Sequence, residues 1–230
     1  MCGLVGVVLR NPSEKDLQLV QQLILEASVR GLHATGLAWI SGSRIQIESA
    51  SKPARTFLNE FGSLDQCIGR DGNLYLVAHL RYSTSDLAFN QPLGDERCAI
   101  IHNGVVSQKD PKSWKRLYGY QCKTRNDSEL LLQALRHRHS PLDVFPDCSA
   151  AVIELHSRKR LRIYRNGKRP LYFAYRRNGV IVCSTQDIGW RCGIAEMIRV
   201  PAGDYVTVNR DGSVKIAEAK VRLADLQRVA

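Results

Sequence analysis

The chain has 230 residues, of which 44% are hydrophobic, and this length suits one well-packed domain better than two very small ones. No run approaches the roughly 20 apolar residues that span a bilayer, and the N-terminus lacks the pattern of a secretory signal. The seven cysteines include no CxxC pair, which argues against a disulfide framework or a zinc site and predicts a cytoplasmic protein with reduced thiols. The net charge of +11 favours anionic partners, so charge alone leaves an acidic protein or nucleic acid open as a neighbour.

The N-terminus carries a cysteine at position 2, directly before an apolar run at residues 4–9. Cysteine is small enough for removal of Met1 to be expected, which leaves Cys2 with a thiol and a free α-amine in one amino acid. An α-amine has a pKa of roughly 8, so part of it is unprotonated near neutral pH and can take the thiol proton. Activation of a nucleophile by its own amino terminus is a known form of covalent catalysis.

Helical periodicity follows this run. Ser13 precedes apolar residues at helical spacing and predicts a capped amphipathic helix over residues 14–30. A second helix is predicted around residues 130–135, with Asp127 or Ser128 as its cap. Short strands are predicted at residues 37–40, 45–47, 74–79 and 98–101.

The last third of the chain predicts antiparallel hairpins. Asn178-Gly179 is a strong hairpin signal between two of the strands. The predicted strand pairs are 150–155 with 161–164, 171–175 with 180–183, and 205–208 with 214–217. Strands grouped with strands indicate an α+β fold with antiparallel sheets, and no glycine-rich loop supports a dinucleotide or P-loop site.

Five segments, in this order, resemble the signatures of the class II glutamine amidotransferase domain, the N-terminal-nucleophile glutaminase type. They are Cys2-Gly3-Leu4-Val5-Gly6, Arg30-Gly31-Leu32-His33-Ala34-Thr35-Gly36, Ala78-His79-Leu80-Arg81-Tyr82-Ser83-Thr84, Ile101-His102-Asn103-Gly104-Val105-Val106 and Asn126-Asp127-Ser128-Glu129. The resemblance covers residues 1–230 as a single domain without a fused synthase domain. It implies a four-layer αββα sandwich of two antiparallel sheets, the N-terminal-nucleophile hydrolase fold.

The resemblance also implies roles for the reacting groups. Cys2 is expected to attack the side-chain amide of L-glutamine and form a thioester. The side-chain amide of Asn103 and the backbone N–H of Gly104 match the oxyanion hole of the family. No metal and no cofactor is expected.

Two charged residues match the positions that hold the amino-acid end of glutamine. Arg81 is expected to bind the α-carboxylate and Asp127 the α-ammonium group. Thr84 lies in the glutamine-covering loop, roughly residues 81–90, and is expected to add a hydrogen bond to the carboxylate. His79 and His102 are interpreted as packed, hydrogen-bonded residues outside the catalytic set.

The resemblance has two departures. Residues 82–85 read Tyr-Ser-Thr-Ser where many relatives have Trp-Ala-Thr-His, and residues 33–35 read His-Ala-Thr where synthase relatives carry an Asp-Ser pair. Neither change removes a catalytic group, but the first predicts a different packing of the covering loop.

The expected function is hydrolysis of L-glutamine to glutamate and ammonia, with the ammonia supplied to a separate acceptor enzyme. Two alternatives stay open at this point. The first is hydrolysis of another γ-glutamyl amide, and the second is a non-catalytic glutamine-sensing or interaction module.

Overall fold

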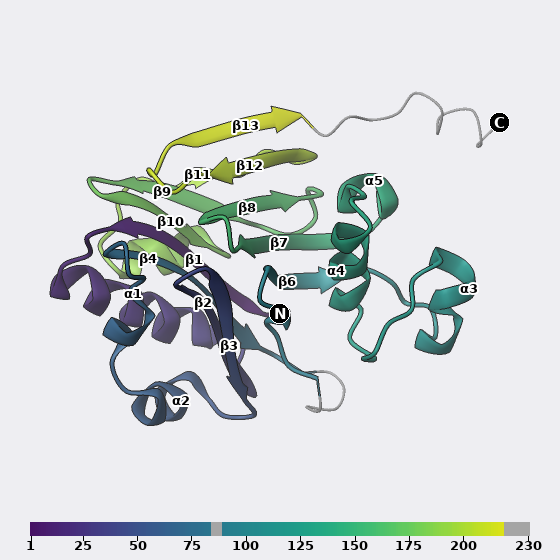
Figure 1. Cartoon of the computed structure of the whole chain (residues 1–230), viewed down its shortest axis with the longest axis horizontal. Helices are drawn as coiled ribbons and strands as arrows, with labels where there is room; N and C mark the ends of the chain where they lie inside the picture. The colour runs from purple at the N-terminus through teal and green to yellow at the C-terminus, as the bar shows by residue number, and fades with distance from the viewer. Residues whose placement is uncertain (84–88, 219–230) are drawn as a thin grey trace.

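Two antiparallel sheets lie face to face in the computed structural model, which describes residues 1–83 and 89–218 (Figure 1). The first sheet has seven strands in the order β11-β9-β10-β1-β4-β2-β3, and the second has six in the order β13-β12-β8-β7-β6-β5. The first sheet contains β1 (Gly3–Arg10), β2 (Ala34–Ser41), β3 (Arg44–Ala50), β4 (Asn73–Arg81), β9 (Tyr172–Arg176), β10 (Gly179–Cys183) and β11 (Ile198–Arg199). The second contains β5 (Leu93–Gly94), β6 (Cys98–Val105), β7 (Ser149–His156), β8 (Arg160–Arg165), β12 (Asp204–Val208) and β13 (Val214–Glu218).

Strand β1 shows why the sheets stack. Successive side chains of a strand point to opposite faces, and β1 is apolar on both. Leu4 and Val8 belong to the hydrophobic cluster between the two sheets, whereas Val5 and Val7 belong to the cluster under the helices. The strand is therefore buried on both faces at the centre of the first sheet.

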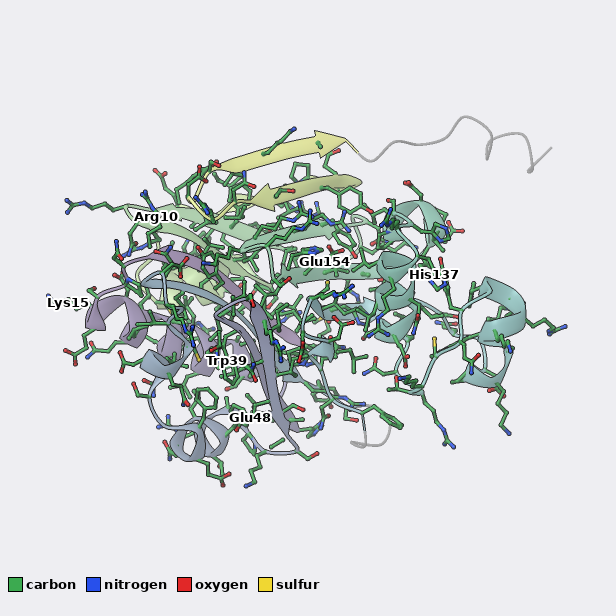
Figure 2. All side chains as sticks on the ribbon, in the orientation of Figure 1. Arg10, Lys15, Trp39, Glu48, His137 and Glu154 are labelled. Atoms are coloured by element: carbon green, nitrogen blue, oxygen red, sulfur yellow. The ribbon has the colours of Figure 1, made fainter. Side chains whose placement is uncertain are left out.

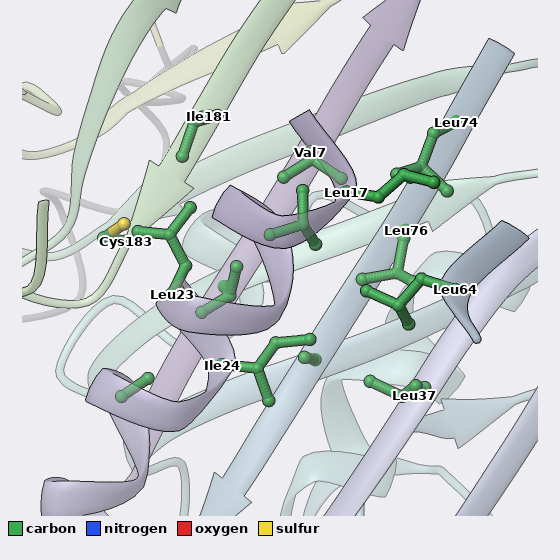
Figure 3. Packing of buried hydrophobic residues seen from close by; sticks show 14 of the residues in the cluster. Val7, Leu17, Leu23, Ile24, Leu37, Leu64, Leu74, Leu76, Ile181 and Cys183 are labelled. Atoms are coloured by element: carbon green, nitrogen blue, oxygen red, sulfur yellow. The ribbon is translucent and has the colours of Figure 1, made fainter. Parts of the chain in front are cut away.

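Helices cover the outer face of each sheet. Helix α1 (Glu14–Ala27) packs Leu17, Leu23 and Ile24 onto Val7 and the neighbouring strands (Figure 3). Helices α2 (Ala54–Phe61) and α6 (Gln186–Arg191) share this cluster, while α3 (Trp114–Tyr118), α4 (Ser128–Arg136) and α5 (Pro141–Val144) share a third cluster with the second sheet. Three short 3₁₀ turns complete the elements: η1 (Ser28–Arg30), η2 (Leu64–Cys67) and η3 (Pro111–Ser113). The expected α+β fold with four αββα layers is confirmed.

Local expectations hold at most elements. Ser13 caps α1 in a capping box with Asp16, and η1 continues the turn to Arg30, which matches the predicted range 14–30. All three predicted hairpins form. The β9–β10 turn consists of Arg177 and Asn178, so the predicted Asn-Gly pair straddles the turn and the start of β10. Within the described part of the chain, no helix is long and apolar enough to cross a membrane.

Candidate functional site

The ends of four elements meet around a pocket of about 340 Å³. Cys2 precedes β1, Arg81 ends β4, Gly104 lies near the end of β6, and Asp127 precedes α4; all four line the pocket. Asn103 lies beside them and contacts Cys2. The fold thus brings together five of the six predicted site residues from distant parts of the sequence. The sixth, Thr84, falls outside the described residues.

Asn103 is buried and faces the backbone of Cys2. Its Oδ1 atom accepts a hydrogen bond of 3.0 Å from the Cys2 backbone nitrogen. This contact fixes the orientation of the amide, so that its Nδ2 group is directed to another side. Nδ2 is buried and has no hydrogen-bond partner among residues 1–83 and 89–218. Because an unsatisfied buried donor costs about 1–3 kcal/mol, an acceptor brought by a ligand would relieve that cost.

Gly104 carries the backbone of β6 past β7 at very short range. Its φ is +143°, a conformation that L side chains rarely adopt, and a Cβ here would lie 1.6 Å from the Ser149 carbonyl oxygen. Glycine is therefore required at this position by both conformation and space. Because glycine has no side chain, the backbone of residue 104 itself forms part of the pocket wall.

The Cys2 thiol is kept in its protonated form. Burial raises the pKa of the Cys2 thiol, and this effect outweighs the backbone N–H of Tyr82 and the charges of Arg81 and Arg30, which lower it. Arg30 also holds the backbone, since its Nε donates to the Cys2 carbonyl oxygen over 3.2 Å. A thiol with a raised pKa needs a base before it can attack. The sequence places Arg30 in a family motif but does not reveal this contact with Cys2.

Arg81 is held in place by the chain that follows the undescribed segment. Its Nη1 donates to the Phe89 carbonyl oxygen and to Asn90 Oδ1, both over 2.8 Å. Asn126 Nδ2 donates to the same Phe89 carbonyl over 3.1 Å, which connects Arg81 to the residues before α4. The guanidinium is thereby fixed at the wall of the pocket.

Of the two predicted caps, Asp127 and Ser128, the structure places Asp127 at the N-cap position of α4, but the expected side-chain capping bond does not form. Its Oδ2 instead accepts from the backbone nitrogens of Val106 and Ser107, over 2.6 and 3.3 Å. Asn126 Oδ1 accepts from the Ser128 backbone nitrogen over 3.1 Å and takes over the role of a cap. The carboxylate of Asp127 is therefore kept beside the pocket.

Two histidines that sequence reasoning leaves outside the catalytic set also line the pocket. His102 Nδ1 lies 2.6 Å from Ser128 Oγ and 3.3 Å from Gln91 Nε2. His79 is fully buried, and neither of its ring nitrogens has a hydrogen-bond partner in the described part of the chain. Burial lowers the pKa of His79 to about 3 and also lowers the pKa of His102. Both rings are therefore neutral near pH 7.

Comparisons with known proteins identify similar sequences. Residues 79–188 match the family model described as a glutamine amidotransferase domain. A curated relative, the isomerizing glutamine–fructose-6-phosphate aminotransferase of Sulfurisphaera tokodaii, is 23% identical over 189 residues, which cover 79% of this chain and 31% of the relative.

Solved structures share the fold. The glutamine phosphoribosylpyrophosphate amidotransferase of B. subtilis superposes with a TM-score of 0.74 at 19% identity, covering 96% of this chain and 50% of that one. A class-II glutamine aminotransferase domain protein from Silicibacter pomeroyi has a TM-score of 0.58 at 14% identity, covering 95% of this chain and 99% of that one. The chain thus spans about a third of the curated relative and half of the B. subtilis enzyme.

Proposed function

Because residues 79–188 match the family model of the glutamine amidotransferase domain, we propose that this chain hydrolyses the side-chain amide of L-glutamine to glutamate and ammonia. The observation that carries the proposal is the Cys2–Asn103 contact. Through this contact, Asn103 Nδ2 is held beside the backbone of Cys2 as a buried donor that has no hydrogen-bond partner among the described residues.

The first step needs a base, because burial keeps the Cys2 thiol protonated. Once Met1 is removed, the α-amine of Cys2 is the nearest basic group and takes the thiol proton. The neighbouring histidine rings are fully buried with lowered pKa values and suit this task less well. The sulfur then attacks the amide carbon of glutamine, and the carbonyl π electrons move to the oxygen.

The negative oxygen of the tetrahedral intermediate requires fixed donors. Asn103 Nδ2 and the backbone N–H of Gly104 are the two donors that we assign to it. The protonated α-amine gives its proton to the leaving nitrogen, which departs as ammonia and leaves a thioester on Cys2. Water then attacks the thioester, glutamate is released, and the thiol is restored.

Specificity for a free amino acid comes from two opposite charges at the pocket wall. We assign the α-carboxylate of glutamine to Arg81, whose guanidinium can bind it bidentately. We assign the α-ammonium group to Asp127, whose carboxylate is held by two backbone amides. Thr84 belongs to the same proposal as a further donor to the carboxylate.

The ammonia released by this reaction is of use only if an acceptor captures it before it is lost to water. We therefore propose that a separate acceptor enzyme receives it from this chain. The family match and the relatives named above give no support to nucleic acid as a partner. Only the positive net charge of the chain favours it.

Purified protein tests the proposal. We expect the wild type to release equal amounts of glutamate and ammonia from L-glutamine, and Cys2→Ala to release neither. Cys192→Ala, which removes another partly exposed thiol at the end of α6, serves as the matched control and should retain full activity. Intact mass must show loss of Met1 in each protein.

A panel of substrates separates the alternatives. Activity on other γ-glutamyl amides without activity on glutamine would replace the glutamine-specific proposal by the broader amide hydrolase. No turnover of any amide by correctly processed protein that still binds glutamine would favour a sensing module.

A further inference from the structure

Two basic clusters of the sequence, unused by the catalytic proposal, converge on one hollow of about 590 Å³. One cluster lies at the end of α4, at residues 136–139, and the other in the β7–β8 turn and the start of β8, at residues 158–162. Figure 2 labels His137, which directly follows α4, and Glu154 in β7; these two elements flank the hollow. We call it the arginine basin and define its rim by Arg97, Arg138, Arg158 and Arg160.

The rim carries positive charge that the described chain does not neutralise. Arg136 forms a salt bridge with Asp95 over 2.9 Å, and Arg162 forms one with Glu154 over 2.6 Å. Among residues 1–83 and 89–218, the four rim arginines form no salt bridge, and the buried Nε of Arg160 has no hydrogen-bond partner. Within that part of the chain, four guanidinium groups without a salt bridge, from three segments of the sequence, therefore surround one hollow.

Arg138 holds its place on the rim in an unfavourable conformation. Its φ is +60°, and it follows α4 where glycine is the usual residue. Its backbone nitrogen bonds to the Leu135 carbonyl, so this residue forms the turn that ends the helix. A left-handed conformation is unfavourable for a residue with a side chain. The side chain thus occupies a position where glycine would stabilise the fold, which points to a use outside folding.

The floor and the surroundings of the basin indicate what it binds. Cys98, Leu132 and Leu135 form an apolar floor under the basic rim. The C-terminal end of α4 lies here and disfavours any anion, so the attraction must come from the guanidinium groups and not from the helix N–H groups that compact phosphate sites use. Separated guanidinium groups over an apolar floor fit a peptide segment of another protein that carries both carboxylates and an apolar side chain. Residues 219–230 do not fit, because they include three basic residues and one acidic residue.

We propose that the arginine basin binds an acidic segment of a partner protein, with its carboxylates on the rim and an apolar side chain on the floor. If the proposed function holds, this partner is the ammonia acceptor. Helix α4 begins next to Asp127 at the glutamine pocket and ends with Arg136 at the basin, and β6 begins with Cys98 at the basin and reaches Gly104 at the pocket. With a rise of about 1.5 Å per residue, a nine-residue helix places the two sites roughly 13 Å apart.

A fluorescein-labelled, glutamate-rich peptide with one leucine per helical turn is the probe, and anisotropy without glutamine is the measurement. We expect salt-dependent binding that weakens at least about tenfold in the triple variant Arg97→Gln/Arg138→Gly/Arg158→Gln. The matched control is Arg10→Gln/Arg176→Gln/Arg177→Gln, which removes three arginines around a different polar hollow. It should change binding by less than about twofold.

Several outcomes would overturn the proposal. Equal weakening in both triple variants would show attraction by net charge alone, and no binding at low salt would remove the site. Displacement of the peptide by pyrophosphate, or tighter basin-dependent binding of a single-stranded oligonucleotide, would assign the basin to phosphate groups or nucleic acid instead.

Two further readouts keep the test independent of folding and of the catalytic proposal. The single variant Arg138→Gly should raise Tm by about 2–4 °C while it weakens peptide binding, because glycine relieves the left-handed conformation. A fall in Tm would show that Arg138 supports the fold and would remove the argument from strain. Ammonia release by both triple variants should equal that of the wild type, so a failure of peptide binding and a failure of catalysis are seen separately.

Discussion

The backbone nitrogen of Cys2 and the side-chain oxygen of Asn103 lie 3.0 Å apart, although 101 positions separate the two residues in the sequence. The contact joins the residue before β1, a strand of the first sheet, to β6 of the second sheet. Because Asn103 accepts this hydrogen bond through its side-chain oxygen, its side-chain nitrogen points in a different direction. The same side chain can therefore orient the nucleophile and stabilise the charge that develops during attack.

Replacing Asn103 by alanine should lower kcat for glutamine hydrolysis by about 100-fold to 1000-fold, with a much smaller change in KM. The reason is that the lost donor acts on charge present only in the transition state. Steady-state kinetics of ammonia release measures both parameters. Asn209→Ala, in the β12–β13 turn, removes an amide far from the pocket and serves as the control. A loss of less than about tenfold in Asn103→Ala would contradict the assigned role.

Replacing Asp127 by asparagine should raise KM for glutamine by about 10-fold to 100-fold, the effect of losing one charge-assisted hydrogen bond. The asparagine oxygen can still accept from the Val106 amide, so the local structure is expected to remain. Kinetics with a glutamine analogue that lacks the α-amine gives the sharper measurement, because the substitution should not affect that analogue. Asp143→Asn, at an exposed position, is the control. Equal effects on glutamine and on the analogue would remove Asp127 from recognition of the ammonium group.

Much of the fold could be predicted because local patterns and buried surfaces agree. Ser13 caps the first helix as expected, and the hairpins of the last third form in the predicted pairs. The four-layer arrangement came from the family resemblance rather than from periodicity. Periodicity identifies which face of an element is apolar but not which element covers it.

Other features depend on contacts that no local pattern records. Asn178-Gly179 predicted the hairpin, yet Gly179 is required because a Cβ there would lie 1.9 Å from the Val8 carbonyl of the neighbouring strand. Asp127 has the sequence context of a helix cap, but the amides of Val106 and Ser107 compete successfully for its carboxylate. The ring of His79 lies at the pocket wall and has no hydrogen-bond partner among the described residues. Nothing in the sequence around His79 distinguishes this arrangement from that of an ordinary core histidine.

Replacing Gly104 by alanine should lower the free energy of unfolding by at least about 3 kcal/mol, because strain at positive φ adds to a clash with the Ser149 carbonyl. Gly119→Ala is the matched control. Gly119 has a φ of +75°, but a Cβ at this position would meet no described atom within 4 Å, so only the strain of about 1 kcal/mol applies. Denaturant titration of the two variants measures the difference. A similar loss of unfolding free energy in both variants would show that β6 and β7 can move apart easily. The close approach of the two strands would then not require glycine at position 104.

Acid should destabilise the protein through Glu154, a fully buried carboxylate in β7. Burial alone would raise its pKa, but Arg162 and His156 outweigh burial and lower the pKa of Glu154 from 4.5 to about 2. A carboxyl group with a lowered pKa stabilises the folded state above its unfolded pKa and loses that contribution as pH falls through the folded value. The interval is therefore from about pH 4.5 to about pH 2, and the contribution lost is about 3 kcal/mol.

The variant Glu154→Gln should lose stability near neutral pH, because Arg162 then lacks its partner, and should show a weaker dependence on pH within this interval. Unfolding by urea at a series of pH values measures both effects. Glu60→Gln breaks the exposed pair with Lys52 and should change stability by less than about 1 kcal/mol at every pH. An unchanged pH dependence in Glu154→Gln would mean that other carboxylates carry the acid sensitivity and that the buried pair contributes nothing to it.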